Sequence, residues 1–154
     1  MNILEVQEDE KEILTILGKS LKHNSPRKNT EEFISIVNQL SLRLPSRIKC
    51  ELEKFKKSGD EYGALLIRNL PNDPFVITPK DNKEHIGETT ILANIQALFN
   101  EYMGHMVSYE AEGDGYLFQD MVPNKELRKT QTSLGSNVEL ELHTEQAFSD
   151  YRPD

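Results

Sequence analysis

The sequence predicts an α+β or β-rich domain in which an N-terminal group of helices covers strands that come later in the chain. Apolar residues recur at helical spacing through the first 60 residues. A short apolar run at 62–68 and alternating segments after Gly104 have the shorter period of strands. Helices that precede strands in this way are typical of the α+β class. We therefore expect one domain overall, with a helical region at 1–60 and a strand-rich region at 61–154.

Three helices are predicted in the first 60 residues. The first carries apolar residues between Val6 and Leu21 and ends before a loop at 24–26. Asn29 and Glu32 have the spacing of a capping box and predict the start of the second helix. Pro45 suits the first turn of a third helix, and Gly59 is expected to end it. A fourth helix, from about Ile91 to Met103, has the strongest apolar pattern in the chain.

Strands are predicted on both sides of that fourth helix. Tyr62–Arg68 is apolar and is expected to be a buried strand. Val107–Glu110 and Gly115–Val122 are two further predicted strands. A polar loop of thirteen residues, 123–135, precedes a last strand at 138–145. Its length is typical of a functional loop.

Composition excludes several classes of function. The net charge is −8 and the pI is near 5.1, whereas nucleic-acid binding needs clustered Lys and Arg. The N-terminus is acidic and lacks the apolar core of a signal peptide, and no apolar run is long enough to span a bilayer. Cys50 is the only cysteine, which fits a reducing compartment. We expect a cytoplasmic protein that binds neither nucleic acid nor membrane.

The predicted last strand carries the candidate metal ligands. His143 and Glu145 are two residues apart and so face the same way on a strand. Imidazole and carboxylate are two of the three protein ligands of the two-His-one-carboxylate site that suits non-haem Fe(II). The alternative is a half-buried strand with a solvated acidic face, because Glu139 and Glu141 lie on the same side. His105, just after the fourth helix, is interpreted as a helix-terminal residue rather than a ligand.

Four segments in the second half of the chain form a combined pattern: Gln119–Pro123, Gln131–Ser133, Leu140–Phe148 and Tyr151–Asp154. Together they resemble the clavaminate synthase-like branch of the Fe(II)/2-oxoglutarate-dependent oxygenases, which includes amino-acid β-hydroxylases. The upstream segment Tyr62–Pro71 also resembles the first core strand of that family.

The resemblance implies a double-stranded β-helix (jelly roll, cupin-like) with helices packed outside, of which residues 61–154 would form the first part. It implies His143 and Glu145 as iron ligands and 2-oxoglutarate as co-substrate. It implies that Ser133 binds the α-carboxylate of an amino-acid substrate. Gln119 would line the same pocket and Gln131 would contact substrate through its backbone, while Glu145 would also receive the substrate amino group.

The family's second His ligand, and the Arg that holds 2-oxoglutarate, come later in the family pattern than Asp154 does here. The resemblance therefore implies the N-terminal portion of an oxygenase that hydroxylates a free amino acid or a related small molecule. Such a portion would need a complementing C-terminal half. The alternative hypotheses are a non-catalytic module for binding or homo-oligomerisation and an acidic helical adaptor with a short sheet.

Overall fold

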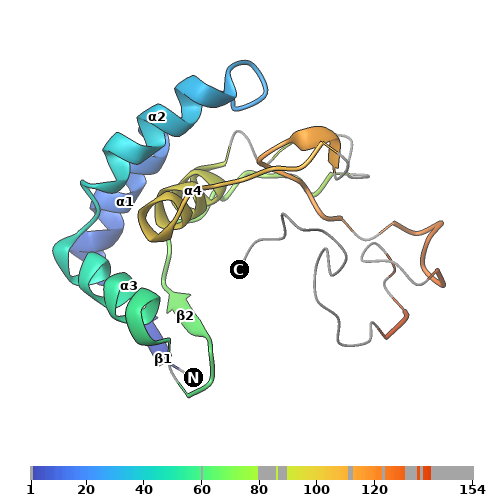
Figure 1. Cartoon of the computed structure of the whole chain (residues 1–154). Helices are drawn as coiled ribbons and strands as arrows, with labels where there is room; N and C mark the ends of the chain where they lie inside the picture. The colour runs from blue at the N-terminus through green and yellow to red at the C-terminus, as the bar shows by residue number, and fades with distance from the viewer. Residues whose placement is uncertain are drawn as a thin grey trace.

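The computed structural model describes residues 2–59, 61–79, 86, 90–110, 113–122, 124–130, 135 and 137–139. These residues form two strands, four helices and one 3-10 turn (Figure 1). In chain order the elements are β1 (Asn2–Glu5), α1 (Glu8–Ser20), α2 (Thr30–Ser41), α3 (Ser46–Ser58), β2 (Leu65–Arg68), α4 (Ile91–Met103) and the turn η2 (Gly113–Gly115).

The four predicted helices are confirmed. The Asn29 side chain accepts a hydrogen bond from the Glu32 backbone N–H at 3.1 Å, and its own amide donates to the Glu32 carboxylate. This reciprocal pair satisfies a backbone donor that the first turn of α2 would otherwise leave unpaired. Pro45 is the residue that precedes α3 rather than part of its first turn. Gly59 ends α3 with a φ of 57°, a conformation that disfavours side chains with a Cβ.

Helix α4 is the centre of the core. It packs against α1, α2 and α3, and Figure 1 shows it crossing the middle of the molecule beside them. Ile95 and Leu98 of α4 are fully buried. The buried apolar side chains of the three other helices and the chain segments between them are Leu14, Leu17, Leu21, Phe33, Val37, Leu44, Ile48 and Leu52.

The sheet contains a strand that the sequence pattern did not predict. β1 lies parallel to β2, with Asn2 opposite Leu65 and Glu5 opposite Arg68. The helical prediction for all of 1–60 is therefore wrong at its first residues. β1 has four residues, and the strand that gives it hydrogen bonds is about 60 residues away, so local periodicity carried little signal.

The predicted strand at Tyr62–Arg68 is confirmed only from Leu65 onward. Gly63 has a φ of 63° and belongs to a turn, which delays the strand. The strand is also less buried than predicted, because its exposure alternates and Leu66 is 40% exposed. One face of the small sheet packs on the helices through Leu4, and the other face is open to solvent.

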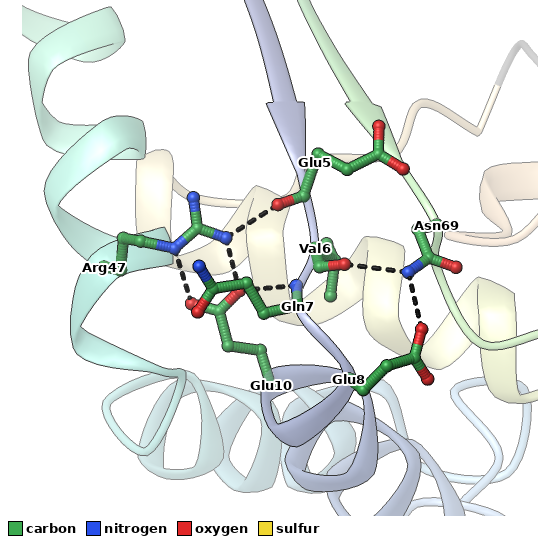
Figure 2. A network of polar contacts seen from close by, with 7 residues as sticks. All are labelled: Glu5, Val6, Gln7, Glu8, Glu10, Arg47 and Asn69. Atoms are coloured by element: carbon green, nitrogen blue, oxygen red, sulfur yellow. Dashed lines mark hydrogen bonds and ion pairs between the residues drawn. The ribbon is translucent and has the colours of Figure 1, made fainter.

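An ion pair ties the sheet to the helices (Figure 2). The Arg47 guanidinium of α3 donates to the Glu10 carboxylate of α1, with an Nε–Oε1 distance of 2.9 Å, and to the Glu5 carbonyl of β1 at 2.7 Å. The Gln7 backbone N–H also donates to Glu10. These donors, Arg47 first, hold the pKa of the buried Glu10 carboxyl below its ordinary value.

Asn69 forms a second link at the end of the sheet. Its φ of 61° lies in the left-handed region, which Asn tolerates better than most residues. The side-chain amide donates to the Val6 carbonyl at 2.8 Å and to the Glu8 carboxylate at 3.0 Å (Figure 2). Lys11 donates to the Asn69 side-chain oxygen. The chain that leaves β2 is thus joined to the chain that leaves β1.

Two other strand predictions are wrong. Val107–Glu110 forms no strand, and Gly115–Val122 begins in the turn η2 and continues as irregular chain. Asp114 and Gly115 have φ values of 57° and 71°, which break an extended conformation. A strand also needs a neighbour for its backbone groups, and no other strand of the described chain lies against these segments.

The predicted last strand falls mostly outside the described residues. Val138 and Glu139 are described and are not part of a strand, and 140–145 are not described. The double-stranded β-helix core thus remains a prediction at this point. No helix among the described residues is long and apolar enough to cross a membrane.

Candidate functional site

An open groove of about 1070 Å³ lies along one side of α4. One wall is α4 itself, which contributes Leu92, Gln96 and Asn100. The irregular chain at 105–109 and 116–122 also lines the groove, and this chain includes most of the two strands predicted at 107–110 and 115–122. Val76, Thr78 and Pro79 line it as well.

The start of α4 is held by two side-chain caps. The Thr90 hydroxyl accepts from the Ala93 backbone N–H at 3.2 Å. The Asp73 carboxylate accepts from the N–H groups of Ile91 and Leu92, at 2.8 and 3.3 Å. A carboxylate at this end also complements the positive end of the helix dipole. The caps therefore fix where the α4 wall of the groove begins.

Aromatic contacts attach the opposite wall to the helical core. The Arg27 guanidinium lies over the Tyr116 ring, 3.4 Å from its centroid. Phe118 meets Phe33 of α2 edge to face, with ring centroids 5.5 Å apart. Both geometries are favourable for aromatic side chains. Residues 116–118 are thus attached to Arg27 and to α2, although they belong to no sheet among the described residues.

A buried carboxylate lies at the end of α4 and contacts the residues that follow the helix. Glu101 is 6% exposed and receives three contacts: the Asn38 side-chain amide at 3.2 Å, the His105 ring Nδ1 at 3.2 Å and the Met106 backbone N–H at 3.3 Å. A buried carboxylate needs such partners to offset its desolvation. The prediction that His105 lies at a helix end is confirmed, because it directly follows Gly104, the C-cap residue of α4, and its side chain is 87% exposed.

Gln119 lies in the lining of the groove. Its side chain is exposed, and its amide is 3.5 Å from the Tyr116 carbonyl oxygen. The family pattern predicted this residue in a substrate pocket. Asp120, which the sequence reasoning did not single out, also lines the groove and is the only carboxylate among the described lining residues.

The remaining predicted site residues, His143, Glu145, Ser133 and Gln131, lie outside the described residues. Within the described ranges, no three His, Cys, Asp or Glu side chains come close enough together to hold a metal ion. The iron site therefore stays a prediction from the sequence pattern.

Comparison with known proteins supports the resemblance. The chain is 47% identical to an L-lysine 3-hydroxylase of Catenulispora acidiphila over 124 residues, which are 80% of this chain and 35% of that protein. It is 32% identical to an L-lysine 4-hydroxylase of Chitinophaga pinensis over 158 residues, covering 95% and 41% of the two chains. It is 26% identical to clavaminate synthase 2 of Streptomyces clavuligerus over 132 residues, which are 84% of this chain and 40% of that protein. No protein-family model matches the chain.

The fold is also similar to that of solved oxygenase structures. A crystal structure of asparagine oxygenase superimposes on 99% of this chain with a TM-score of 0.85, at 23% identity, and the match covers 49% of that structure. The chain is therefore related to the clavaminate synthase-like Fe(II)/2-oxoglutarate-dependent oxygenases, as its motifs predicted. It spans less than half the length of the relatives that it matches.

Proposed function

We propose that this chain is the N-terminal portion of an Fe(II)/2-oxoglutarate-dependent oxygenase that hydroxylates a free basic amino acid, with L-lysine as the first candidate. The observation that carries the proposal is the 47% identity to an L-lysine 3-hydroxylase over 124 residues. Related enzymes with lower identity are named for lysine, asparagine and enduracididine, so the substrate class of free amino acids is better supported than lysine itself.

In this proposal His143 and Glu145 hold the iron, and the residue that completes the ligand set comes from the second half of the domain. Imidazole and carboxylate are a donor set that suits Fe(II). The iron and 2-oxoglutarate, once bound, would supply the oxidising chemistry with O2 as the oxidant, so that one oxygen atom goes to succinate and the other to the hydroxylated amino acid. Residues 61–154 would form the first part of a double-stranded β-helix, with the helices of 1–60 packed outside it.

The groove along α4 is the proposed substrate side of this chain. Gln119 would orient the amino acid from the groove wall, Ser133 would bind its α-carboxylate and Gln131 would contact it through the backbone. Glu145 would accept the substrate amino group in addition to holding iron. Asp120 supplies the groove with a negative charge, which suits a cationic side chain. Cys50 is a free thiol, and this is compatible with the reducing cytoplasm proposed for the protein.

The test is a fusion of residues 1–154 to the part of the L-lysine 3-hydroxylase that lies beyond its match to this chain. The fusion is incubated with Fe(II), 2-oxoglutarate and L-lysine, and succinate and hydroxylysine are measured by mass spectrometry. We expect both products in equal amounts. His143→Ala and Glu145→Ala should each lower the rate by about 100-fold or more, because each removes a metal ligand. His23→Ala, on an exposed loop residue, is the matched control and should leave the rate unchanged.

A folded fusion that binds Fe(II) and 2-oxoglutarate without hydroxylating any amino acid would contradict the proposal. That result would favour the alternative of a non-catalytic binding or oligomerisation module. Anaerobic titration with Fe(II) and 2-oxoglutarate, followed by the visible charge-transfer band, separates loss of cofactor binding from loss of substrate turnover.

A further inference from the structure

We propose that a small cavity between the end of α1 and the start of α4 binds a free α-amino acid in its zwitterionic form. The cavity has a volume of about 230 Å³. Its lining residues are Gly18, Lys19, Lys22, Asp73, Ile91 and Asn94. One water molecule takes up about 30 Å³ in the liquid, and pockets for drug-sized ligands begin at about 300 Å³, so the cavity has the size of a site for a small metabolite.

The cavity and the groove lie on opposite faces of α4. Ile91 and Asn94 line the cavity, whereas Leu92, Gln96 and Asn100 line the groove. Because an α-helix has about 3.6 residues per turn, these two sets project to opposite sides of the helix axis. The two linings share no residue. A ligand in the cavity would therefore leave the groove open, and this second site does not depend on the proposed function.

Asn94 provides a buried acceptor that lacks a donor. The residue is 1% exposed, and its side-chain amide donates to the Gly18 carbonyl at 2.9 Å. The reversed amide would bring its oxygen against that carbonyl, so the hydrogen bond fixes the orientation of the side chain. Within the described residues, Oδ1 of Asn94 accepts no hydrogen bond. A buried oxygen without a donor costs free energy, which a ligand that donates a hydrogen bond would recover.

Asp73 provides a second acceptor in the lining. Its hydrogen bonds from the N–H groups of Ile91 and Leu92 both end on Oδ2. No described residue donates to the other oxygen, Oδ1. The Asp73 carboxylate already complements the positive end of the α4 dipole, so a second anion gains little at this helix start. The two free oxygens instead favour a positively charged donor, such as an ammonium group.

Lys19 and Lys22 bring the opposite charge to the same cavity. They are exposed and three residues apart around the end of α1. Lys19 in the last turn also complements the α1 dipole, as Lys56 and Lys57 do at the end of α3. That role does not explain why both lysines line a cavity that contains two acceptors without donors. Cations and acceptors together match a ligand with a carboxylate and an ammonium group on adjacent atoms, which is an α-amino acid.

Titration of the isotope-labelled chain with glycine, L-alanine and L-lysine, followed by amide NMR spectra, tests the proposal without iron or 2-oxoglutarate. The side-chain amide of Asn94 and the backbone N–H of Gly18 should shift and saturate, because both belong to the cavity lining. The side-chain amide of Gln119 reports separately on the groove. Propylamine and propionate each have only one of the two charges, and each should bind at least about 10-fold more weakly than L-alanine.

Charge variants test which side chains hold the ligand. The double variant Lys19→Gln and Lys22→Gln removes the cations, and Asp73→Asn removes the anion. Each should raise the dissociation constant of L-alanine about 5- to 10-fold. The double variant Lys56→Gln and Lys57→Gln is the matched control, because it removes two exposed lysines from another helix end. It should leave the dissociation constant unchanged.

Three results would overturn the proposal. No saturable shift of Asn94 with any of the three amino acids would show that the cavity holds only water. Propionate that binds as tightly as L-alanine would show a simple anion site at the lysines. Shifts confined to Gln119 would place amino-acid binding in the groove alone, which supports the proposed function and contradicts the second site. Saturable shifts at Asn94 together with an inactive fusion would support the second site and contradict the proposed function.

Discussion

Three buried polar residues form hydrogen bonds that join one helix of this protein to another. Glu10, Asn94 and Glu101 are buried, and each reaches a partner from another element. The Asn94 side-chain amide of α4 donates to the Gly18 carbonyl of α1 at 2.9 Å. The Glu10 carboxylate receives Arg47 of α3, and Glu101 of α4 receives Asn38 of α2. Removing one partner would leave a buried polar atom unpaired, which costs more than the bond itself contributes.

The first prediction at this scale concerns pH. The Arg47 guanidinium lowers the pKa of the Glu10 carboxyl from its ordinary value of 4.5, so the ionised form is favoured in the folded state. Its contribution to stability is present above pH 4.5 and is lost as the pH falls through the lower, folded value. Glu10→Gln should therefore cost about 1 kcal/mol at neutral pH, and less as the pH falls below the ordinary value.

Urea denaturation at neutral and at acidic pH measures this difference. Glu12→Gln, on an exposed position of the same helix, is the matched control for loss of one negative charge. A cost of Glu10→Gln that stays constant from neutral to acidic pH would argue against the ion pair as its source.

The second residue-scale prediction concerns Gly18. An added Cβ would lie 2.8 Å from Ile91 Cγ2 and 3.1 Å from the Ile91 carbonyl oxygen, at the contact of α1 with α4. Glycine to alanine normally stabilises a helix, but here the backbone of α4 cannot move aside without shifting the helix. We expect Gly18→Ala to destabilise the fold by about 1–3 kcal/mol in thermal or urea unfolding.

Gly104→Ala is the control for that experiment. Gly104 has an extended backbone with a φ of −171°, and no heavy atom lies within 4 Å of its added Cβ. Its replacement should change stability by less than about 0.5 kcal/mol. Similar costs at the two glycines would mean that the close approach at Gly18 is not the cause.

At the scale of elements, caps explain why α2 and α4 begin where they do. Asn29 caps α2 from the adjacent residue, and the spacing to Glu32 made this start visible in the sequence. Helix α4 is capped locally by Thr90 and also from 18 residues away by Asp73. The second cap joins the loop after β2 to the groove wall, and local spacing gives no sign of it.

Asp73→Ala should destabilise the chain by about 1 kcal/mol, because two N–H groups at the start of α4 lose their acceptor. Asp73→Asn keeps an acceptor and loses the charge that complements the helix dipole, so its cost should be about half as large. Thermal unfolding measures both, and amide hydrogen exchange at Ile91 and Leu92 reports the local effect. Asn72→Ala, at the neighbouring exposed position, should leave both readouts unchanged.

The sheet is the element that depends most on distant residues. Two strands of four residues are marginal by themselves. Arg47, Asn69 and the burial of Leu4 against the helices hold them in place. Ile3 and Leu66, which are opposite one another in the register, form an exposed apolar pair on the outer face.

At the scale of the whole molecule, the described structure is a helical layer with its central helix open on one side. Helices α1, α2 and α3 pack against α4. Within the described residues, the groove side of α4 and the chain at 105–122 have no sheet to pack on. This organisation agrees with a chain that matches about half of an oxygenase domain. It also explains why the predicted strands at Val107–Glu110 and Gly115–Val122 are irregular, since their backbone groups have no strand partner there.

The sequence by itself determined the four helices, because each rests on contacts within a few residues: apolar spacing, the Asn29 cap and the terminal Gly59. Its motifs also determined the relation to the oxygenases and brought His143, Glu145 and Gln119 forward as site residues. The tertiary structure decided the pairing of β1 with β2, the Arg47–Glu10 ion pair, the Asp73 cap and the groove beside Gln119. Those features join residues 18 to more than 60 positions apart. They exist only after the chain has closed on itself, so no local pattern could reveal them.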